Sequence, residues 1–561
     1  MAKKQGGWLL AKTLYDMGVR DIFTLAGGHI NPIYKACTDL GIRLIDTHHE
    51  QGAAMAADAY GRVTRKPGVC LVTAGPGLTN ALTGLAGSFL SNSPMILIAG
   101  RSGVEENDKM SLQEIDQIAM VKPVTKWART IYDINRIPEY VSNAYKTAFT
   151  GKPGPVYLGT SYEVLYPKTE QKNLSSFDLN IPQTNYEPAS TKINEVLKLL
   201  DKAKKPIVIF GSGSWYSKSE TELEEFIKNL NIPAFTLNMG RGIIPDKYCF
   251  GPASPSSPKG FREIAGNSDL IILLGIRLSI YIGFGSSFNK NAKIIQVDIN
   301  PDEISRNIKS DCSVISDLKS FITKMNSYFK TSPDKLNFKD WNKEANAIRN
   351  RTYKLFRSSV LNSRKKAIHP AKVAKVVSDF LGEEGIAVVD GGDCQSWTDT
   401  TYEVENPGHY VKGGPLGCMG VGIPFALGTK AANPDKKVAL ITGDGAVAMN
   451  FMEIETAVKH KLPFVVIVCN DSAWGMTKHQ VEITYPKAKG IQGVELGFIE
   501  FDKIAKAMGG GGETVTDINK LEPALKRAFK SNLPYVINVK TDPDAVSGAT
   551  HVITQMMMKG M

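Results

Sequence analysis

The sequence is poor in cysteine and histidine and lacks long apolar runs. Seven cysteines among 561 residues form no CxxC pair, which argues against a structural zinc site and a disulfide framework. We therefore expect reduced thiols. No apolar run approaches the roughly 20 residues of a membrane helix, and the first residues lack the unbroken apolar core of a signal peptide. We expect a cytoplasmic protein without a membrane partner.

A concentrated basic tract is also missing. Lysine and arginine total 67 against 56 acidic residues, a net charge of +11, but the lysines are scattered along the chain. A nucleic-acid-binding protein usually gathers such charge on one face or in one tract. We therefore expect no nucleic-acid partner, and interpret the excess as a solvated surface that helps to attract anionic substrates.

What the sequence does contain is a recurring unit, a short apolar run followed by a helix-like segment. Examples are "GVCLVTAGPG" in the first third, "KPIVIFGSGSW" in the middle and "KVALITGDGA" in the last third. Apolar strands alternating with helices indicate parallel sheets covered on both faces. Three such sets predict an α/β protein of three doubly wound parallel-sheet domains, at residues 1–170, 190–340 and 365–561.

The most informative segment is "ALITGDGAVAMNFMEIETAVKHKLPFVVIVCNDSAWGM". One predicted strand ends in Gly443-Asp444-Gly445, and the next ends in Asn470-Asp471, 27 positions after Asp444. Adjacent parallel strands end at the same edge of a sheet, where ligands of α/β proteins bind. The two aspartates therefore predict a Mg²⁺ site completed by phosphate oxygens, and Gly445 lets a helix start approach those oxygens.

This segment closely resembles the signature of thiamine-diphosphate enzymes. The resemblance implies pyrimidine-binding, central and diphosphate-binding domains in that order, with thiamine diphosphate and Mg²⁺ as cofactors. It implies metal ligands in the side chains of Asp444 and Asp471 and the carbonyl of Ala473; the family usually has asparagine where Asp471 stands. The implied cofactor-binding residues are Glu50, Gly392, Asp393, Gly417, Met419, Gly443, Asp444, Gly445, Asp471, Trp474, Gly475 and Met476.

Glu50, in "RLIDTHHEQGAAMAADAYGR", stands where the family keeps a glutamate that hydrogen-bonds to the cofactor's aminopyrimidine ring. Taken alone, it would be a helix-start glutamate favoured by the helix dipole. With the magnesium motif present, we interpret Glu50 as the cofactor activator. The family's glutamate comes from one subunit and its diphosphate site from another, which implies a homodimer or homotetramer with active sites shared between subunits.

Within the family, the stretch "TLAGGHINPIYKAC" is most similar to benzaldehyde lyase, as are "LQEIDQIAMVKPVTKWA" and "NDSAWGMTKHQ". The resemblance implies a carbon–carbon lyase/carboligase that cleaves or forms 2-hydroxy ketones (acyloins) from aldehydes. His29 would be the proton relay, or would orient a water molecule that acts as the relay, a task suited to a neutral imidazole near pH 7. Gln113 would hydrogen-bond to the substrate carbonyl or hydroxyl.

The predicted substrate pocket departs from that enzyme at several positions, including Gly413, where it has a second histidine. Acetolactate synthase, acting on pyruvate, is one alternative, favoured by Gln395 and disfavoured by His29. A 2-hydroxyacyl-CoA lyase or oxalyl-CoA decarboxylase is another, although no basic clamp for CoA phosphates is evident near the end of the chain. The predicted pocket residues are Gly28, His29, Gln113, Tyr162, Gln395 and Met476.

Overall fold

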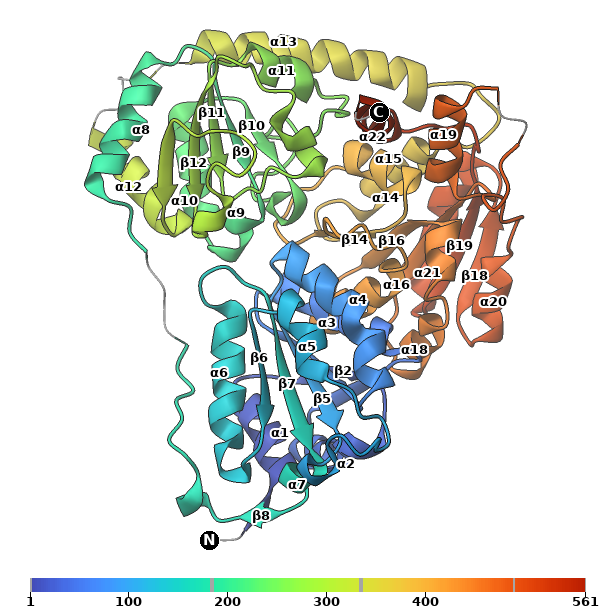
Figure 1. The fold of residues 1–561 in the computed structure, drawn as a ribbon. Helices are drawn as coiled ribbons and strands as arrows, with labels where there is room; N and C mark the ends of the chain where they lie inside the picture. Colours follow the sequence, from blue (N-terminus) through green and yellow to red (C-terminus); the bar gives the residue numbers. More distant parts are fainter. Residues whose placement is uncertain (1–2, 182–185, 332–335, 337, 488–489, 560–561) are drawn as a thin grey trace. The chain divides into compact units, whose positions relative to one another are not determined.

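The computed structural model describes residues 3–181, 186–331, 336, 338–487 and 490–559 (Figure 1). The chain divides into two compact units. Unit 1 contains residues 1–183, 413–435 and 450–463, and unit 2 contains residues 184–412, 436–449 and 464–561. Each unit is described by itself.

Unit 1 is built on a six-stranded sheet with the order β3-β2-β4-β5-β7-β6, in which all neighbours are parallel. Its central strands are completely buried, as expected for a sheet covered on both faces. The strands are β2 (Asp21–Thr24), β3 (Arg43–Asp46), β4 (Gly68–Val72), β5 (Met95–Arg101), β6 (Trp127–Ile131) and β7 (Pro155–Ser161). A short antiparallel pair joins β1 (Lys4–Gln5) to β8 (Lys168–Thr169).

Helices of unit 1 come from two distant parts of the sequence. The first part supplies α1 (Gly6–Asp16), α2 (Asn31–Leu40), α3 (Glu50–Thr64), α4 (Pro76–Ser91), α5 (Gln117–Val121), α6 (Ile137–Phe149) and α7 (Tyr162–Leu165). The last third adds α16 (Gly422–Ala432) and α18 (Glu453–Lys459), of which α16 packs extensively on α3. Helix α3 is rich in alanine and glycine, so its backbone comes close to its neighbours.

Unit 2 contains two further parallel sheets. The first has the order β10-β9-β11-β12-β13. Its strands are β9 (Pro206–Phe210), β10 (Ala234–Thr236), β11 (Leu270–Leu274), β12 (Lys293–Asp298) and β13 (Cys312–Ile315). Alternate residues of β9 and β11 enter two separate cores, one under α8 (Ser190–Lys202), α10 (Glu220–Leu230) and α12 (Leu318–Thr331), the other under α11 (Phe261–Asn267) and α13 (Lys339–Phe356). Helix α9 (Ser212–Tyr216) follows β9.

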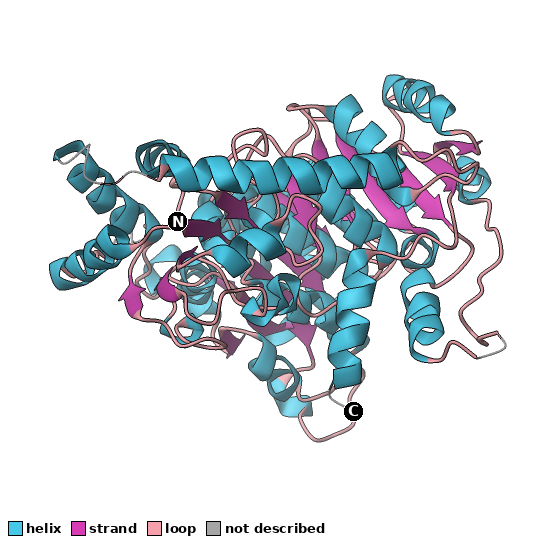
Figure 2. Cartoon of the chain, turned by 90° about the horizontal axis from the view of Figure 1, so that it is seen from above, coloured by secondary structure: helices cyan, strands magenta, loops and turns pink. Residues whose placement is uncertain are grey.

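The second sheet of unit 2 has the order β15-β14-β16-β17-β19-β18. Its strands are β14 (Ile386–Val389), β15 (Tyr410–Lys412), β16 (Val438–Gly443), β17 (Val465–Asn470), β18 (Gly511–Val515) and β19 (Tyr535–Lys540). The helices are α14 (Pro370–Leu381), α15 (Asp393–Thr401), α17 (Asp444–Ala448), α19 (Gly475–Thr484), α20 (Phe501–Ala507), α21 (Leu521–Ser531) and α22 (Gly548–Lys559). Figure 2 shows the strands in magenta enclosed by helices in cyan.

The three parallel sheets confirm the predicted fold class, and each lies inside one of the three predicted ranges. Segments 413–435 and 450–463, however, pack with the first range rather than with the rest of the third. Sequence patterns do not show this exchange, because the helices concerned have ordinary amphipathic or apolar character. Among the described residues, no helix combines the length and apolar character needed to span a bilayer.

Candidate functional site

The predicted residues of unit 1 gather beyond the carboxyl ends of one sheet. His29 lies in a short turn (Gly28–Ile30) after β2, Glu50 begins α3 after β3, and Tyr162 begins α7 after β7. Gln113 belongs to the loop that follows β5, and Gly28 is exposed beside His29. This is the edge at which parallel α/β sheets bind ligands.

His29 is half-buried, and its Nδ1 lies 3.2 Å from Thr73 Oγ1 in the segment after β4. Burial lowers the pKa of His29 below its usual 6.5, against a smaller opposing effect of Glu106. The imidazole is therefore neutral at pH 7. Because the threonine hydroxyl engages Nδ1, the predicted proton exchange with a substrate would fall to Nε2. Thr73 was not predicted, although it lies in the segment "TAGPGLTNA" that follows β4.

Glu50 is 7% exposed, and its Oε2 accepts a hydrogen bond of 2.9 Å from Asn80 Nδ2 of α4. A carboxylate at the first position of a helix also gains from the positive end of the helix dipole. The side chain is therefore held in a defined position by a neighbouring helix. Asn80 lies in the same "TAGPGLTNA" motif as Thr73 and was likewise not predicted.

Gln113 is half-buried and has a left-handed backbone, with φ of 64°. Its main chain packs on Gly75, where an added Cβ would lie 2.9 Å from the Gln113 carbonyl oxygen. A non-glycine residue with positive φ is uncommon and marks a strained position. Tyr162 is 36% exposed, and a hydrogen bond with Glu106 raises the pKa of its hydroxyl. His29 and Tyr162 thus share Glu106 as an electrostatic neighbour.

Gly417 and Met419 lie in the loop that precedes α16, also in unit 1. Gly417 has φ of 72° and its N–H donates to the Gly414 carbonyl at 3.0 Å. Met419 is 39% exposed. Their cofactor-binding roles remain predictions.

Unit 2 brings the predicted metal ligands together. Strands β16 and β17 pair in parallel, with Gly443 opposite Cys469, so Asp444 and Asp471 follow neighbouring strand ends. Asp444 is 2% exposed, and its Oδ2 has no hydrogen-bond partner. Burial, and then the nearby charge of Asp471, raise the pKa of Asp444 to about 8. Two adjacent carboxyl groups, the buried Asp444 with an unpartnered oxygen and the half-buried Asp471, fit a bound divalent cation.

The third predicted ligand, the Ala473 carbonyl, also fits. Ala473 forms an isolated antiparallel β-bridge with Glu495. In one of the two hydrogen bonds of this bridge the Trp474 N–H donates to the Val494 carbonyl at 2.7 Å, and in the other the Ser472 carbonyl accepts. The Ala473 carbonyl takes part in neither. Ser472 has φ of 62°, a strained turn of the kind found at functional sites. Across the described residues, no group of three or more His, Cys, Asp or Glu side chains could hold a metal; the predicted set has two carboxylates and a carbonyl.

Glycines surround this pair of aspartates closely. A Cβ at Gly475 would lie 2.5 Å from Asp471 Oδ2, and one at Gly445 would lie 2.5 Å from the Trp474 ring. A Cβ at Gly392 would lie 2.7 Å from the Cβ of Met476. The predicted cofactor residues of unit 2 therefore form one compact constellation at the ends of β14, β16 and β17, in which a larger side chain at these glycines would displace a neighbour. Gln395 lies in the first turns of α15 beside it.

The side chain of Asp393, predicted to lie in the loop nearest the diphosphate, makes contacts within the protein. Its Oδ2 lies 2.7 Å from His479 Nδ1, and its Oδ1 accepts hydrogen bonds from Ser547 N (3.0 Å) and Thr550 Oγ1 (2.6 Å). Burial alone would raise its pKa, but these hydrogen bonds outweigh burial and lower it. The carboxylate is thus engaged within the protein, so any contact with a diphosphate falls to the backbone of this turn.

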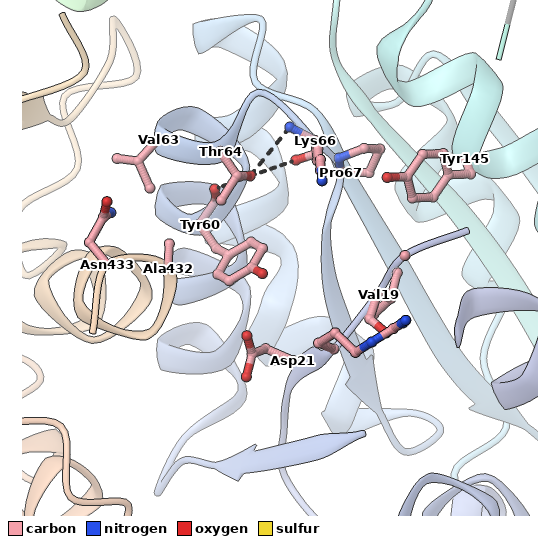
Figure 3. Close-up of a pocket in the computed structure, with 12 residues that line it drawn as sticks. Val19, Asp21, Tyr60, Val63, Thr64, Lys66, Pro67, Tyr145, Ala432 and Asn433 are labelled. Carbon is pink, nitrogen blue, oxygen red and sulfur yellow. Dashed lines mark hydrogen bonds between the residues drawn. The ribbon is translucent and has the colours of Figure 1, made fainter. Parts of the chain in front are cut away.

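None of the predicted site residues lines the cavity of about 290 Å³ shown in Figure 3. This cavity lies in unit 1 at the opposite edge of the sheet, where Asp21 begins β2 and Pro67 precedes β4. Tyr60, Lys66 and Tyr145 are among its lining residues. The predicted site is instead assembled from loops at the carboxyl edge.

Comparison with known proteins agrees with this arrangement of domains and motifs. Three family models match, described as the N-terminal TPP binding domain (residues 4–120), the central domain (193–325) and the C-terminal TPP binding domain (390–539) of thiamine pyrophosphate enzymes. TPP is thiamine pyrophosphate, the same molecule as thiamine diphosphate.

Curated relatives match along nearly the whole chain. A probable acetolactate synthase large subunit of Methanococcus aeolicus is 31% identical over 565 residues, covering 96% of this chain and 92% of that protein. A probable acetolactate synthase of Mycobacterium bovis is 30% identical, covering 96% of each chain. The 2-hydroxyacyl-CoA lyase 2 of Danio rerio is 28% identical, covering 94% and 89%. The chain belongs to the thiamine pyrophosphate enzymes and is a TPP-dependent enzyme of the carboligase and lyase kind.

Proposed function

We propose that this enzyme cleaves and forms 2-hydroxy ketones, joining or releasing aldehydes, with Mg²⁺ as the metal partner of thiamine diphosphate. When bound, the cofactor supplies a nucleophilic carbon that adds to carbonyl groups and then stores the electron pair. The observation that carries the proposal is the half-buried His29, neutral at pH 7 and held by Thr73 at the sheet edge where Glu50 lies.

The residues of this chain would divide the work as follows. Glu50, oriented by Asn80, would hold the aminopyrimidine ring of the cofactor. Asp444, Asp471 and the Ala473 carbonyl would hold Mg²⁺. His29 Nε2 would take the proton of the substrate hydroxyl during cleavage and return it to the new alkoxide during ligation, as a general base and acid of suitable pKa.

The named relatives support chemistry next to a hydroxyl-bearing carbon. A 2-hydroxyacyl-CoA lyase, by its name, cleaves a compound of this type, and aldehyde release needs no decarboxylation. The motifs around His29 and Gln113, which we interpret as benzaldehyde lyase-like from the sequence, add an aldehyde as the proposed partner. The pocket positions Tyr162, Gln395 and Met476 differ from that enzyme, so we include short aliphatic aldehydes among the substrates.

A second candidate is an acetolactate synthase-like reaction, which joins two pyruvate-derived units with loss of carbon dioxide. The names of the Methanococcus and Mycobacterium relatives favour it, and so does Gln395 in its loop. His29 is the residue that disfavours it, because the synthases generally lack a histidine there.

One experiment separates the candidates. The purified enzyme with Mg²⁺ and thiamine diphosphate is incubated in parallel with pyruvate, benzaldehyde, formaldehyde, an acyloin and a 2-hydroxyacyl-CoA, and products are identified by mass spectrometry. Aldehydes converted to acyloins, or acyloins cleaved, with pyruvate unchanged, would support the proposal. Acetolactate and carbon dioxide from pyruvate would replace it with the second candidate, and cleavage of the thioester alone would assign a CoA-dependent lyase.

A further inference from the structure

The turn that leads into Glu50 is held by a buried carboxylate from another part of the chain. Residues 47–49 join β3 to α3, and Glu453, the first residue of α18, packs against them within unit 1. Both carboxylate oxygens of Glu453 accept from the His48 N–H, at 3.1 and 3.2 Å. The Thr456 hydroxyl donates to Oε2 at 2.6 Å. Glu453 is 1% exposed.

Burying the Glu453 carboxylate costs free energy, so the groups that it contacts indicate its structural role. Burial raises the pKa of Glu453, and hydrogen bonds from Thr456, His48 and His49 oppose that shift. The His48 and His49 N–H groups precede α3, at the positive end of the helix dipole. A carboxylate there is stabilised by the start of α3 and in turn fixes where that start lies. The residue at the first position of α3 is Glu50.

Gly52 shows how closely the two helices approach. A Cβ at Gly52 would lie 2.8 Å from Glu453 Oε1 and 3.1 Å from its Cδ. The first turn of α3 therefore has room for the carboxylate only because position 52 has no side chain. The contact is a close fit between the turn and Glu453, in addition to its hydrogen bonds.

Two further contacts flank this buried one, of which the His48–Glu455 contact is exposed and the His460–Asp46 contact is half-buried. His48 Nε2 lies 2.7 Å from Glu455 Oε2, and His460 Nε2 lies 2.7 Å from Asp46 Oδ1. Exposed ion pairs contribute little to stability. The His48–Glu455 contact joins the same two segments as Glu453 does, so Glu455 provides a matched control for the buried carboxylate.

We propose that Glu453 is a positioning residue for Glu50: by accepting the His48 and His49 N–H groups, it fixes the turn that places the Glu50 carboxylate against the cofactor. The inference rests on the role of Glu50 in the proposed function. A displacement of about 1 Å in a reacting group can lower a rate about 10²-fold. Loss of the Glu453 carboxylate therefore acts on turnover rather than on substrate binding.

The test compares Glu453→Gln, Glu453→Asp and the control Glu455→Gln. Glutamine keeps the size of Glu453 but replaces one of its two accepting oxygens with an NH₂ donor, so the backbone N–H groups and the Thr456 hydroxyl can no longer all be accepted. We expect Glu453→Gln to lower kcat by about 10- to 100-fold with KM and cofactor affinity changed less than about threefold. Glu453→Asp should recover part of the loss, and Glu455→Gln should match the wild type.

Hydrogen–deuterium exchange of the holoenzyme provides a readout independent of activity. In Glu453→Gln, the peptide covering residues 46–52 should exchange faster than in the wild type, while peptides of the β9–β13 sheet stay unchanged. Glu455→Gln should leave both as they are. Faster exchange throughout the chain, or equal loss of kcat in both variants, would show a general folding defect and overturn the inference.

Glu50→Gln, measured in parallel, separates this inference from the proposed function. If Glu50→Gln abolishes turnover while Glu453→Gln keeps a normal kcat, the positioning role is wrong and the role of Glu50 stands. If Glu50→Gln keeps normal turnover, both assignments fall.

Discussion

At the scale of single residues, two of the three predicted catalytic side chains, Glu50 and His29, have a partner that orients them. Asn80 donates to Glu50, and Thr73 contacts His29. Neither partner stands next to the residue it orients in the sequence. Helix α4 and the end of β4 supply them, so the geometry of both catalytic groups depends on the packing of the sheet edge.

Replacing Glu50 with glutamine removes the carboxylate but keeps its shape and its contact with Asn80. We expect turnover to fall by at least about 10²-fold, the range of proton-transfer contributions. Affinity for thiamine diphosphate, measured by fluorescence or calorimetry, should change little. Asn80→Ala is the companion variant, expected to lower turnover less. A Glu50→Gln enzyme with near-normal rates would contradict the activation role.

His29→Ala should slow both ligation and cleavage by about 10²-fold. Because burial lowers the pKa of His29, the neutral base persists below pH 6.5 in the wild type. The wild-type rate should therefore fall on the acidic side only at a pH below 6.5, and the alanine variant should lose that His29-dependent decline. Rate–pH profiles of both enzymes check this. Unchanged kinetics in His29→Ala would make it an ordinary turn residue.

The metal site can be tested through the unequal roles of its two aspartates. Asp444→Ala should abolish Mg²⁺-dependent binding of thiamine diphosphate, because Asp444 is the buried carboxylate with an unpartnered oxygen. Asp471→Asn introduces the residue usual in the family and should keep binding within about tenfold, since an amide oxygen also suits Mg²⁺. Cofactor titrations with Mg²⁺ and with EDTA measure both. Equal loss in the two variants would contradict this division.

At the scale of elements, the network around Asp393 joins three helices of unit 2. Asp393 begins α15, His479 lies in α19, and Ser547 and Thr550 belong to the start of α22. His479 Nε2 also donates to the Pro543 carbonyl at 2.9 Å. Helix α19 carries Met476 of the predicted pocket, so the network fixes an element of the site without touching a substrate.

His479→Gln should lower the melting temperature, because removing one partner of a buried pair costs about 3 kcal/mol or more. Despite burial, hydrogen bonds with Asp393 and Pro543 raise the pKa of His479 above 6.5. The contribution of the protonated His479 to the free energy of unfolding is complete below pH 6.5 and is lost as the pH rises through that raised pKa. The ionised Asp393, whose pKa is lowered from 3.8, makes its full contribution to the free energy of unfolding above pH 3.8.

The difference in melting temperature between the wild type and His479→Gln should thus be largest between pH 3.8 and 6.5. Scanning calorimetry across this range and up to pH 9 measures it. A difference that grows above pH 7 would show that the imidazole is neutral in the folded protein.

At the scale of the whole molecule, we expect each active site to combine Glu50 of one subunit with Asp444 of another. Mixing Glu50→Gln with Asp444→Ala subunits, each inactive alone, then creates mixed dimers with one intact site. Random pairing would restore about a quarter of the wild-type activity. Subunit exchange after mild dissociation, followed by the product assay, measures the recovery. Absence of recovery, with mixed dimers confirmed by native mass spectrometry, would contradict shared sites.

Much of the site followed from local patterns. The GDG turn, the Asn470-Asp471 strand end and the parallel sheets all depend on short stretches whose geometry is local, and the structure has each in its expected element. Local patterns did not predict that segments 413–435 and 450–463 pack in unit 1. They also did not predict the contact of Glu453 with the turn before Glu50. Such contacts join residues about 400 positions apart, which no periodicity encodes.

The sequence alone determined the class of fold and the residue types available for chemistry, because apolar periodicity and glycine-bounded strand ends express the local physics of parallel sheets. Its resemblance to the thiamine-diphosphate enzymes, rather than that periodicity, indicated the cofactor. Only the tertiary structure decided how those residues are held: which partner orients His29, that the Asp393 carboxylate binds protein rather than facing outward, and that Glu453 supports the start of α3. Burial and hydrogen bonding set pKa values and positions, and both arise from packing between distant segments.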